Sequence, residues 1–414
     1  MPFERILMPE IIKYLSSPEA LIILGSRQVG KTTLLKMIID AIQPEKRAIY
    51  IDLEDPRNLE IVEKGPESLL DYINHLGIPP NEKGYAFIDE IHYMKNPSRF
   101  IKLLVDHHSD KIKLVCTGSS SIGIRIKIHD ALVGRKLTFF LQPLNFGEFL
   151  VFKGRKDLAA HLPVDPFDPG QNPTRYFQDD YLRYFHEFLI FGGYPRIVTE
   201  DDYARKEKLL GEIVSAYIFK DIKSLFNIGD IHKFNDLVRV LAGQTGSLLN
   251  VSGLSETIGL SRPTVMNYIS VLENSFLISL LAPYSRSAQV GVRKAKKLYW
   301  LDNGLRNYLV GDLSVSASRT DIGILLESAV YGGLIKRKKE IEQIHYWRTK
   351  DKTEVDFVIK SGADIIPVEV KSRARSHRGL MSFIKKYNIH TGYVAHLGDY
   401  LKGQPAALPA YWLA

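Results

Sequence analysis

The segment 25–32 has the residue types and the spacing of a phosphate-binding loop. Its residues, GSRQVGKT, fill the pattern GxxxxGK[ST], and they lie between an apolar run at 21–24 and a helical pattern at 33–39. In such loops the glycines let the backbone fold tightly around an anion, the lysine places a cation near the outer phosphates, and the hydroxyl binds Mg2+. A glycine-rich turn that binds nothing would not require all four fixed positions between a strand and a helix. The residues that we expect to contact nucleotide are Gly25, Ser26, Gln28, Val29, Gly30, Lys31, Thr32 and Thr33.

Two carboxylates follow the apolar residues 85–88. A strand that ends in Asp89 and Glu90 delivers both side chains to the edge where open α/β sheets bind ligands. We expect Asp89 to hold Mg2+ together with Thr32. Glu90 would polarise the water that attacks the γ-phosphate, with Lys31 as the catalytic cation. Two solvent-exposed acids at a strand end are the alternative, but their place after a phosphate-binding loop favours the catalytic interpretation.

Polar residues after the next apolar runs predict two further nucleotide contacts. The run 112–117 leads into Gly118 and three serines, where an ATPase sheet places a polar group near the γ-phosphate or the attacking water. We expect Ser119 to take this role, although a helix cap or a plain turn uses the same residue types. Arg135, beside Gly134, is expected to contact nucleotide in its own or a neighbouring subunit. The alternative for Arg135 is an ordinary surface arginine.

Short apolar runs alternate with helical patterns through residues 1–150, which is typical of a mostly parallel sheet with helices on both faces. The expected fold class is therefore α/β. After this part, the Pro-rich and polar stretch 154–175 predicts a loop or insertion. Helical patterns at 179–225, interrupted at 192–195, predict a lid over the nucleotide. The strands that we expect are 21–24, 48–53, 85–89, 112–117 and 137–141.

The composition is that of a globular protein with more than one domain. The chain has 414 residues, of which 45% are hydrophobic and 25% are charged. No apolar run reaches the ~18 residues that cross a bilayer, and residues 1–15 have the pattern of an amphipathic helix without a cleavage site. We therefore expect a cytoplasmic protein with no membrane partner. The single cysteine, Cys116, lies in an apolar run and is expected to be buried.

Positive charge is concentrated in the last third of the chain. Residues 291–414 contain 21 Lys and Arg against 12 Asp and Glu, a net +9, whereas residues 1–290 contain 34 against 35, a net −1. Such an asymmetry indicates a polyanionic partner for the C-terminal part, although solvated lysines produce some of it. DNA is the partner that we expect.

Residues 231–300 have the pattern of a helix-turn-helix followed by a β-hairpin. A short helix at 254–258, a glycine turn and a serine cap lead to a second helix at 262–273 with one apolar face. Strands at 276–281 and 296–300 would form the wing of a winged helix. Such modules also serve for packing alone, and this alternative stays open. The residues that we expect to contact nucleic acid are Arg262, Thr264 and Asn267 and, in the wing, Arg293, Lys294, Lys296 and Lys297.

Two carboxylates and a lysine on a C-terminal hairpin form a set that phosphodiester hydrolysis can use. Asp356 lies on the first predicted strand, and Glu369 and Lys371 share a face of the second. The carboxylates would hold Mg2+, or Mn2+, with Glu327 and the carbonyl of Val370 as further ligands. Lys371 would orient or deprotonate the attacking water. A salt-bridged hairpin that only binds nucleic acid or holds subunits together is the alternative.

Two basic clusters flank this hairpin, at 336–339 and 371–378. A nuclease needs positive charge around its metal site to attract a phosphate backbone, and both clusters are placed to supply it. In the second cluster we expect Arg373 and Arg375 to contact nucleic acid. Charge that only keeps the protein soluble is the alternative.

These motifs together resemble one prokaryotic family of AAA+ ATPases fused to a winged helix and a PD-(D/E)XK-nuclease-like domain. The resemblance implies an AAA+ module in which Asp89 and Glu90 are the Walker B acids and Ser119 lies near the sensor position, and it implies a homo-oligomer. It leaves the second sensor arginine open, with Arg196 as a candidate, and Glu354 to Asp356 replaces the literal Pro-Asp. The motifs that carry the resemblance are the phosphate loop, FIDE at 87–90, TGSS at 117–120, GR at 134–135, QPLNFGEF at 142–149 and GGYP at 192–195.

Four parts are therefore expected. They are an AAA+ P-loop ATPase core at 1–153, a linker insertion and helical lid at 154–228, a winged helix at 229–310 and a PD-(D/E)XK nuclease-like domain at 311–414. The predicted function is ATP hydrolysis with Mg2+ by a DNA-associated protein whose C-terminal domain binds DNA and cleaves it with a divalent metal. The alternative is an ATPase switch whose C-terminal domain is cleavage-inactive and serves protein interaction or assembly. A small-molecule phosphotransferase is a third possibility, which the helix-turn-helix and the basic tail do not favour.

Overall fold

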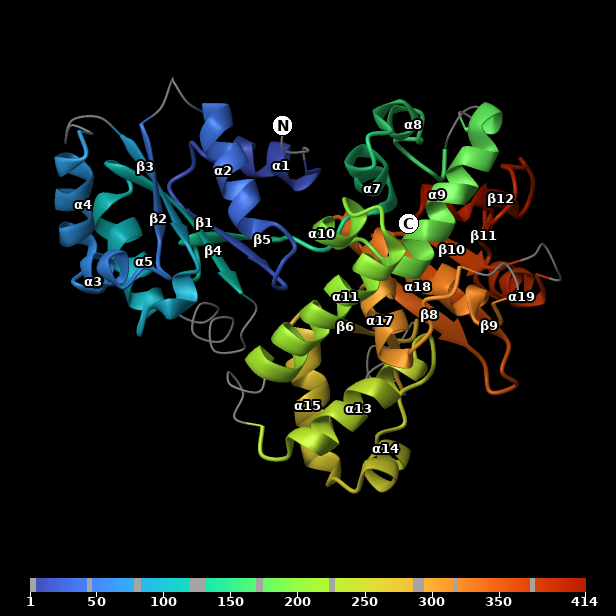
Figure 1. Cartoon of the computed structure of the whole chain (residues 1–414). Coiled ribbons are helices and arrows are strands. Elements are labelled where there is room, and N and C mark those ends of the chain that lie inside the picture. The colour runs from blue at the N-terminus through green and yellow to red at the C-terminus, as the bar shows by residue number, and fades with distance from the viewer. Residues whose placement is uncertain are drawn as a thin grey trace. The chain divides into compact units, whose positions relative to one another are not determined.

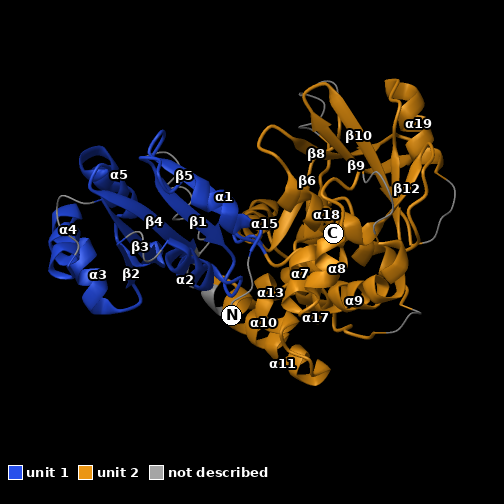
Figure 2. Ribbon diagram, turned by 90° about the horizontal axis from the view of Figure 1, so that it is seen from above, with its two compact units in different colours: residues 1–142, 274–276 blue, residues 143–273, 277–414 orange. Residues whose placement is uncertain are grey.

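The computed structural model forms two compact units, which are coloured separately in Figure 2. The first contains residues 1–142 and 274–276, and the second contains 143–273 and 277–414. The division thus falls at Gln142, whereas the sequence predicted the end of the ATPase core at 153. The segments predicted as lid, winged helix and C-terminal domain belong to the second unit, except for residues 274–276 of the predicted winged helix. The described residues are 5–42, 47–77, 83–119, 132–168, 174–222, 228–285, 294–315, 319–372 and 377–414.

The first unit is built on a parallel five-stranded sheet in the order β2-β3-β4-β1-β5 (Figure 1). All five strands predicted from the sequence are confirmed, with ends that differ by one or two residues. The central strands are buried along their whole length, which explains why they read as uninterrupted apolar runs. The strands are β1 Ala20–Gly25, β2 Ala48–Asp52, β3 Gly84–Asp89, β4 Ile112–Ser119 and β5 Lys136–Phe140.

Helices pack on this sheet through alternating strand residues. On β1, Ala20, Ile22 and Leu24 pack in one core with residues of α4 and α5. Helix α2 also contacts β1 but contributes no residue to that core. Cys116 lies in the same core and is fully buried, as expected. The helices are α1 Leu7–Lys13, α2 Lys31–Ile42, α3 Pro56–Glu63, α4 Pro66–His75, η1 Ile91–Tyr93 and α5 Pro97–His108.

The second unit begins with a helical segment. Residues 154–175, predicted as a loop, contain the short helix α8, and residues 169–173 lie outside the described part. The helices predicted at 179–225 are present as far as residue 222, where the π-helix η3 forms the last turns, and residues 223–225 lie outside the described part. The elements are α7 Phe146–Phe152, α8 Lys156–Ala160, η2 Arg175–Phe177, α9 Gln178–Phe191, α10 Pro195–Val198, α11 Tyr203–Ile213 and η3 Val214–Asp221.

The GGYP motif interrupts these helices because its glycines lie against other parts of the chain: Gly192, with φ 75°, against the side chain of Asp302, and Gly193 against the backbone of Leu144. A Cβ on Gly193 would lie 2.3 Å from the carbonyl oxygen of Leu144, and one on Gly304 would lie 2.1 Å from that of Phe191. The buried carboxylate of Asp302 accepts hydrogen bonds from the N–H groups of Gly193 at 2.7 Å and Leu305 at 2.9 Å. The motif therefore joins the helical segment to α17 (Asn303–Val310).

A helix-turn-helix and a hairpin follow, as predicted. Gly259 has a left-handed backbone, φ 68°, at the turn, and the apolar face of the second helix is buried through Val265, Ile269 and Leu272. The hairpin strands are antiparallel. The elements are α13 Ile231–Gly243, α14 Val251–Ile258, α15 Arg262–Asn274, β6 Ile278–Leu281 and β7 Lys297–Trp300.

The C-terminal part is a mixed five-stranded sheet in the order β12-β11-β10-β9-β8. The predicted hairpin is β9 and β10, paired antiparallel with Val368 opposite Phe357. Helix α18 contacts β10 and β7, and α19 contacts β9 and β10. No helix of the described residues has the length and apolarity to cross a membrane. The elements are α18 Ile322–Arg337, β8 Gln343–Arg348, β9 Glu354–Ser361, β10 Asp364–Val370, α19 Arg378–Tyr387, β11 Tyr393–His396, β12 Ala406–Pro409 and η4 Ala410–Trp412.

Candidate functional site

Asp89 is the centre of a hydrogen-bond network at the carboxyl edge of the parallel sheet. Its Oδ2 accepts from the hydroxyl of Thr32 at 2.6 Å and from that of Tyr50 at 2.9 Å. Its Oδ1 accepts from the hydroxyl of Thr117. Three segments of the chain thus meet at this buried carboxylate, because parallel strands end at one edge. Burial and the bond to Asp89 raise the pKa of Tyr50, so its hydroxyl stays a donor.

The phosphate-binding loop is closed around its own lysine. The ammonium of Lys31 donates to the carbonyls of Gly25 at 3.2 Å and Ser26 at 3.1 Å, and the side chain is buried. Burial lowers the pKa of Lys31, and the charges of Glu90 and Asp89 oppose that shift. A bound phosphate would offer this ammonium a full negative charge in place of two carbonyl dipoles.

Two glycines of the loop are required by its backbone. Gly30 has a φ of 94°, a backbone angle that residues with a side chain rarely adopt. A Cβ on Gly25 would lie 2.2 Å from the carbonyl oxygen of Leu141. Ser119, predicted to face the γ-phosphate, pairs in register with Gly25, so its backbone lies beside the start of the loop.

Glu90 is held just after the strand in a left-handed conformation, φ 56° and ψ 49°. Its N–H donates to the hydroxyl oxygen of Thr117 at 3.0 Å, and its carboxylate lies 2.9 Å from Nδ1 of His92. Neither Thr117 nor His92 was predicted. A lone threonine at the end of the apolar run 112–117 was a usable signal for the first, because a polar residue inside a buried strand needs a partner.

Arg5 is a further contact that the sequence did not predict. Its guanidinium is buried and donates to the carbonyl of Val29 at 2.8 Å and to that of Gln142 at 2.6 Å. It therefore supports the phosphate-binding loop from behind. Its position in an amphipathic N-terminal stretch held no signal for this role.

Arg135 is not placed to contact nucleotide in its own subunit, which corrects that expectation. The N–H of Ala20 donates to the carbonyl of Arg135, so Arg135 lies beside the start of β1, whereas the phosphate-binding loop follows the end of β1 at Gly25. A six-residue strand separates these two edges by about 20 Å. The guanidinium instead donates to Asp106 at 2.5 Å.

The C-terminal hairpin does bring together the predicted catalytic set. Asp356 is buried, and its Oδ2 accepts from the N–H of Val370 at 2.8 Å. Because Val368 pairs with Phe357, Glu369 is the next residue opposite Asp356. The ammonium of Lys371 lies 2.9 Å from Oε1 of Glu369. Burial is the largest cause that raises the pKa of Asp356 to about 7, and the negative charge of Glu327 is the second.

Lys297 is not a wing contact but a buried member of this acidic cluster. The prediction placed it on the surface, yet only 4% of its side chain is exposed. Its ammonium lies 3.0 Å from Glu327 and 3.8 Å from Asp356, and it forms an ion pair with Glu354. Burial lowers the pKa of Lys297, but these carboxylates outweigh it and raise the pKa overall. The predicted site contained more acidic side chains than Lys371 alone could neutralise. This excess of negative charge was the signal in the sequence for a second cation.

Glu327 is consequently not a free metal ligand, which corrects a second expectation. Its Oε1 accepts from Lys297 at 3.0 Å and from the hydroxyl of Tyr299 at 2.5 Å. Within the described residues, no group of three or more His, Cys, Asp or Glu side chains is arranged to hold a metal ion. The two carboxylates of Asp356 and Glu369 remain as possible ligands.

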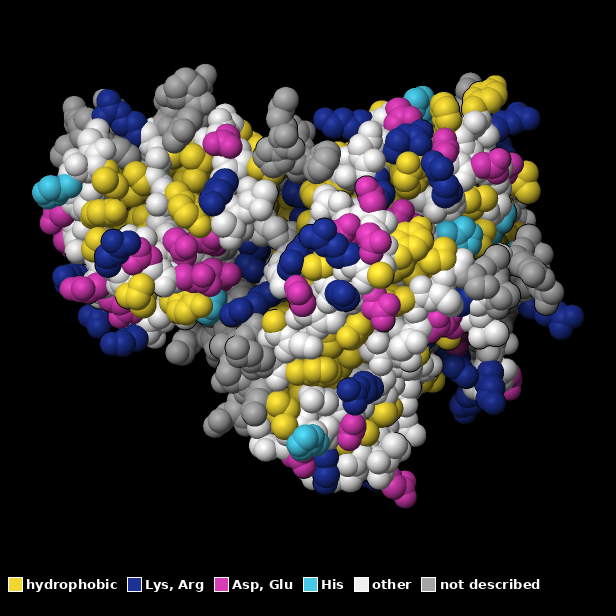
Figure 3. Space-filling view, in the orientation of Figure 1, with side chains coloured by type: hydrophobic (Ala, Val, Ile, Leu, Met, Phe, Trp, Pro, Cys, Tyr) yellow, Lys and Arg dark blue, Asp and Glu magenta, His cyan; other side chains and the backbone are white. Residues whose placement is uncertain are grey.

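The predicted nucleic-acid contacts that the structure describes lie on α15 and in the segment just before and within β7. Arg262 and Asn267 on α15 are exposed, and Thr264 is half-buried. Lys294 and Lys296 are exposed just before β7. Arg293, Arg373 and Arg375 lie outside the described residues. On the face drawn in Figure 3, Lys and Arg are interspersed with Asp and Glu, so surface charge alone does not mark a binding face there.

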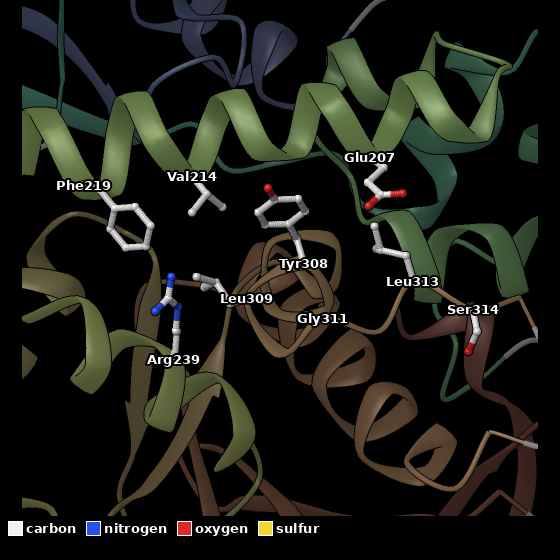
Figure 4. Close-up of a pocket in the computed structure, with 9 residues that line it drawn as sticks. All are labelled: Glu207, Val214, Phe219, Arg239, Tyr308, Leu309, Gly311, Leu313 and Ser314. Carbon is white, nitrogen blue, oxygen red and sulfur yellow. The ribbon is translucent and has the colours of Figure 1, made fainter. Parts of the chain in front are cut away.

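A separate hollow of about 610 Å³ lies in the helical part of the second unit (Figure 4). Glu207, Arg239 and Tyr308 line it, and the guanidinium of Arg239 lies 6.0 Å from the ring centre of Phe219. None of its lining residues belongs to either predicted catalytic set. It therefore adds nothing to the two sites above.

Comparison with known proteins places the chain among uncharacterised relatives. The uncharacterised protein MJ1544 of Methanocaldococcus jannaschii is 30% identical over 347 residues, which cover 82% of this chain and 71% of that protein. The chain belongs to the MJ1544 family. An uncharacterised protein of Haemophilus influenzae is 25% identical and covers 88% of this chain and 85% of its own length.

Family models divide this MJ1544-family chain into three parts. Residues 17–150 match an AAA domain, and residues 182–317 and 322–411 match two domains of unknown function, DUF8612 and DUF4143. The AAA match and the parallel sheet identify an AAA+ P-loop ATPase domain, as the sequence predicted. The RuvB Holliday junction branch migration motor of Thermotoga maritima is 14% identical, over 67% of this chain and 89% of that chain, with a TM-score of 0.32. A TM-score this low supports no further statement.

Proposed function

We propose that this chain is a DNA-associated AAA+ protein in which Thr32, Asp89 and Glu90 hydrolyse ATP bound at the phosphate-binding loop. The observation that supports it best is the 2.6 Å hydrogen bond between Thr32 and Asp89. It brings the hydroxyl of the loop and the carboxylate of β3 to one point at the edge of the sheet. These are the two oxygen ligands that P-loop ATPases use for Mg2+.

The chemistry of this donor set fits Mg2+. The cation prefers oxygen ligands and keeps several waters, so one hydroxyl and one carboxylate beside the phosphates suffice. When bound with ATP, Mg2+ neutralises charge on the β- and γ-phosphates. The chain itself would supply the rest. The loop N–H groups and Lys31 would bind the phosphates, and Glu90 would accept a proton from the attacking water.

Thr117 would position the catalytic base. Its hydroxyl oxygen accepts from the N–H of Glu90 and its proton goes to Asp89, so one buried side chain links the metal ligand to the base. The left-handed backbone at Glu90 turns the chain from the end of β3 into η1. A 1 Å misplacement of such a group costs about 100-fold in rate.

DNA binding would use α15 and the residues that precede β7. The helices α13, α14 and α15 and the β6–β7 hairpin have the order of a winged helix, in which the last helix enters the major groove. Arg262 and Asn267 are exposed on α15, and Lys294 and Lys296 are exposed beside the hairpin. Cations at these two places would contact phosphates of one duplex.

Metal-dependent DNA cleavage at the C-terminal hairpin is a second candidate function. The observation in its favour is that Asp356, Glu369 and Lys371 converge, although they come from two strands. Among the described residues, the buried Oε2 of Glu369 has no hydrogen-bond partner, which fits the role of a cation ligand. A divalent metal there would activate water and offset charge on the phosphate. A cleavage-inactive domain used for protein interaction or assembly is the alternative.

One matched set of variants tests the proposal. Wild type, Lys31→Ala, Glu90→Gln and Asp356→Asn are assayed for ATP turnover with Mg2+, for duplex-DNA affinity, and for DNA cleavage with Mg2+ or Mn2+. We expect Lys31→Ala and Glu90→Gln to lose turnover, and Asp356→Asn to keep it. Turnover that survives Lys31→Ala would disprove ATP hydrolysis at this site. Intact turnover without DNA binding would favour the switch with an inactive C-terminal domain.

A further inference from the structure

The C-terminal acidic cluster consists of two groups that share Asp356. One group surrounds the ammonium of Lys297 with Glu327, Glu354 and Oδ1 of Asp356. In the other, Glu369 lies opposite Asp356 on the neighbouring strand, with Lys371 on its Oε1. Each group therefore has a place for one positive charge.

Lys297 is held firmly in the first place. Its backbone pairs with Leu281 in the β6–β7 hairpin, and its ammonium lies 5.8 Å from the ring centre of Tyr346. Tyr299, two residues on, donates to the same oxygen of Glu327 at 2.5 Å. A divalent cation among these three carboxylates would have to displace an ammonium that the hairpin holds in position.

We propose that the ammonium of Lys297 takes the place of one cation in this cluster, so that the cluster binds a single divalent cation, between Asp356 and Glu369. The proposal rests on the metal-dependent second candidate function above. It thereby adds a residue of the β6–β7 hairpin to the C-terminal site. Lys297 is then a positioning residue, which holds Asp356 and Glu327 without contacting the divalent cation.

The charges of the cluster fit one divalent cation. Four carboxylates, those of Glu327, Glu354, Asp356 and Glu369, face Lys297, Lys371 and Arg348, which lies 3.1 Å from Glu354. With all four carboxylates ionised, as they would be around a bound divalent cation, one negative charge remains uncompensated. A single divalent cation leaves the cluster near neutrality, whereas two would give it three excess positive charges.

The second place has an independent sign of a missing partner. Glu369 is 5% exposed, and its Oε2 has no hydrogen-bond partner among the described atoms. A buried carboxylate oxygen without a hydrogen-bond partner is unfavourable unless a cation lies beside it. Lys371 contacts only the other oxygen, Oε1.

The test is a titration of the full chain with Mn2+ in the absence of nucleotide. Electron paramagnetic resonance measures the free Mn2+ during the titration. All proteins carry Asp89→Asn, which removes the carboxylate of the ATPase site. In this background we expect one Mn2+ per chain, and binding at least about tenfold weaker after Asp356→Asn or Glu369→Gln. Lys297→Met should raise the stoichiometry to two, whereas Lys296→Met, which removes an exposed neighbouring charge, should leave it at one.

Lys297→Met leaves three carboxylates without their ammonium. A second variant is therefore included to separate misfolding from a change in metal binding. Lys297→Met/Glu354→Gln removes one of those charges and one ligand of the new place, so it should fold and return the stoichiometry to one. Circular dichroism reports folding for each variant.

Three results would overturn the proposal. If the Asp89→Asn protein binds no Mn2+ and the added Lys297→Met makes it bind one, the lysine excludes metal altogether. If neither binds, the cluster is only an ion-pair network. If Lys297→Met still binds one, Lys297 holds no cation place. Because the experiment measures metal binding, an absence of DNA cleavage alone would contradict the second candidate function but not this proposal.

Discussion

The backbone N–H of Glu90 donates to the hydroxyl oxygen of Thr117 at 3.0 Å, and the same hydroxyl donates to Asp89. The backbone of the residue that follows Asp89 is thus held by a side chain of the neighbouring strand. We expect Thr117→Val, which keeps the shape and removes the hydroxyl, to lower kcat for ATP on the order of tenfold or more with little change in KM. Steady-state ATP turnover checks this, with Thr117→Ser as control. Equal activity of the Val and Ser variants would contradict the role.

Arg135 should be dispensable for turnover within one subunit. It lies at the edge of the sheet opposite the phosphate-binding loop and pairs with Asp106. We expect Arg135→Ala to retain ATP turnover within about twofold, because an exposed ion pair far from the reacting atoms contributes little. Turnover is measured over a range of protein concentrations. A loss that appears only as the protein assembles would show that Arg135 acts on a neighbouring subunit.

Gly193 should be intolerant of any side chain. A Cβ there would lie 2.3 Å from the carbonyl oxygen of Leu144, so we expect Gly193→Ala to lower the free energy of unfolding by about 1–3 kcal/mol. All three tryptophans, Trp300, Trp347 and Trp412, belong to the second unit, so their fluorescence reports its urea unfolding. Gly323→Ala is the matched control, since its Cβ would meet nothing within 4 Å. Equal stability of both variants would refute the steric argument.

Asp356 should make the second unit less stable as pH rises. Burial and Glu327 raise its pKa from 3.8 to about 7, so the folded chain binds this proton more tightly than the unfolded chain does. The contribution is therefore full below about pH 4 and is lost as the pH rises to about 7. In EDTA, the free energy of unfolding of wild type should fall over this window relative to that of Asp356→Asn. Asp351→Asn, at an exposed turn, should follow wild type. Parallel pH profiles for wild type and Asp356→Asn would count against a raised pKa.

Arg262 and Lys296 should contribute to DNA affinity through phosphates. Replacing either by Ala should weaken duplex binding similarly for unrelated sequences and reduce the slope of log affinity against log salt by about 0.9. Fluorescence anisotropy at several salt concentrations measures both quantities. Lys350→Ala, an exposed cation on the β8–β9 turn, is the control that should leave the slope unchanged. An unchanged slope in both variants would place the DNA elsewhere.

Local patterns were sufficient for much of the fold. The five strands of the parallel sheet, the helix α15 and the β9–β10 hairpin were predicted because apolar periodicity depends on neighbouring residues. The phosphate-binding loop was equally local, since its glycines, lysine and threonine lie within eight positions. The end of the first unit was less accessible, because it depends on which distant segments pack together.

Short motifs in the sequence were enough to predict the phosphate-binding loop and the Asp356–Glu369–Lys371 set. The surroundings of both sets became known only from the folded chain. Lys297 stands in a basic run that predicted exposure, yet its partners Glu327, Glu354 and Asp356 come from a helix and a strand further along the chain. Burial of a charge depends on whether distant residues supply its counter-charge, and no local pattern carries that information.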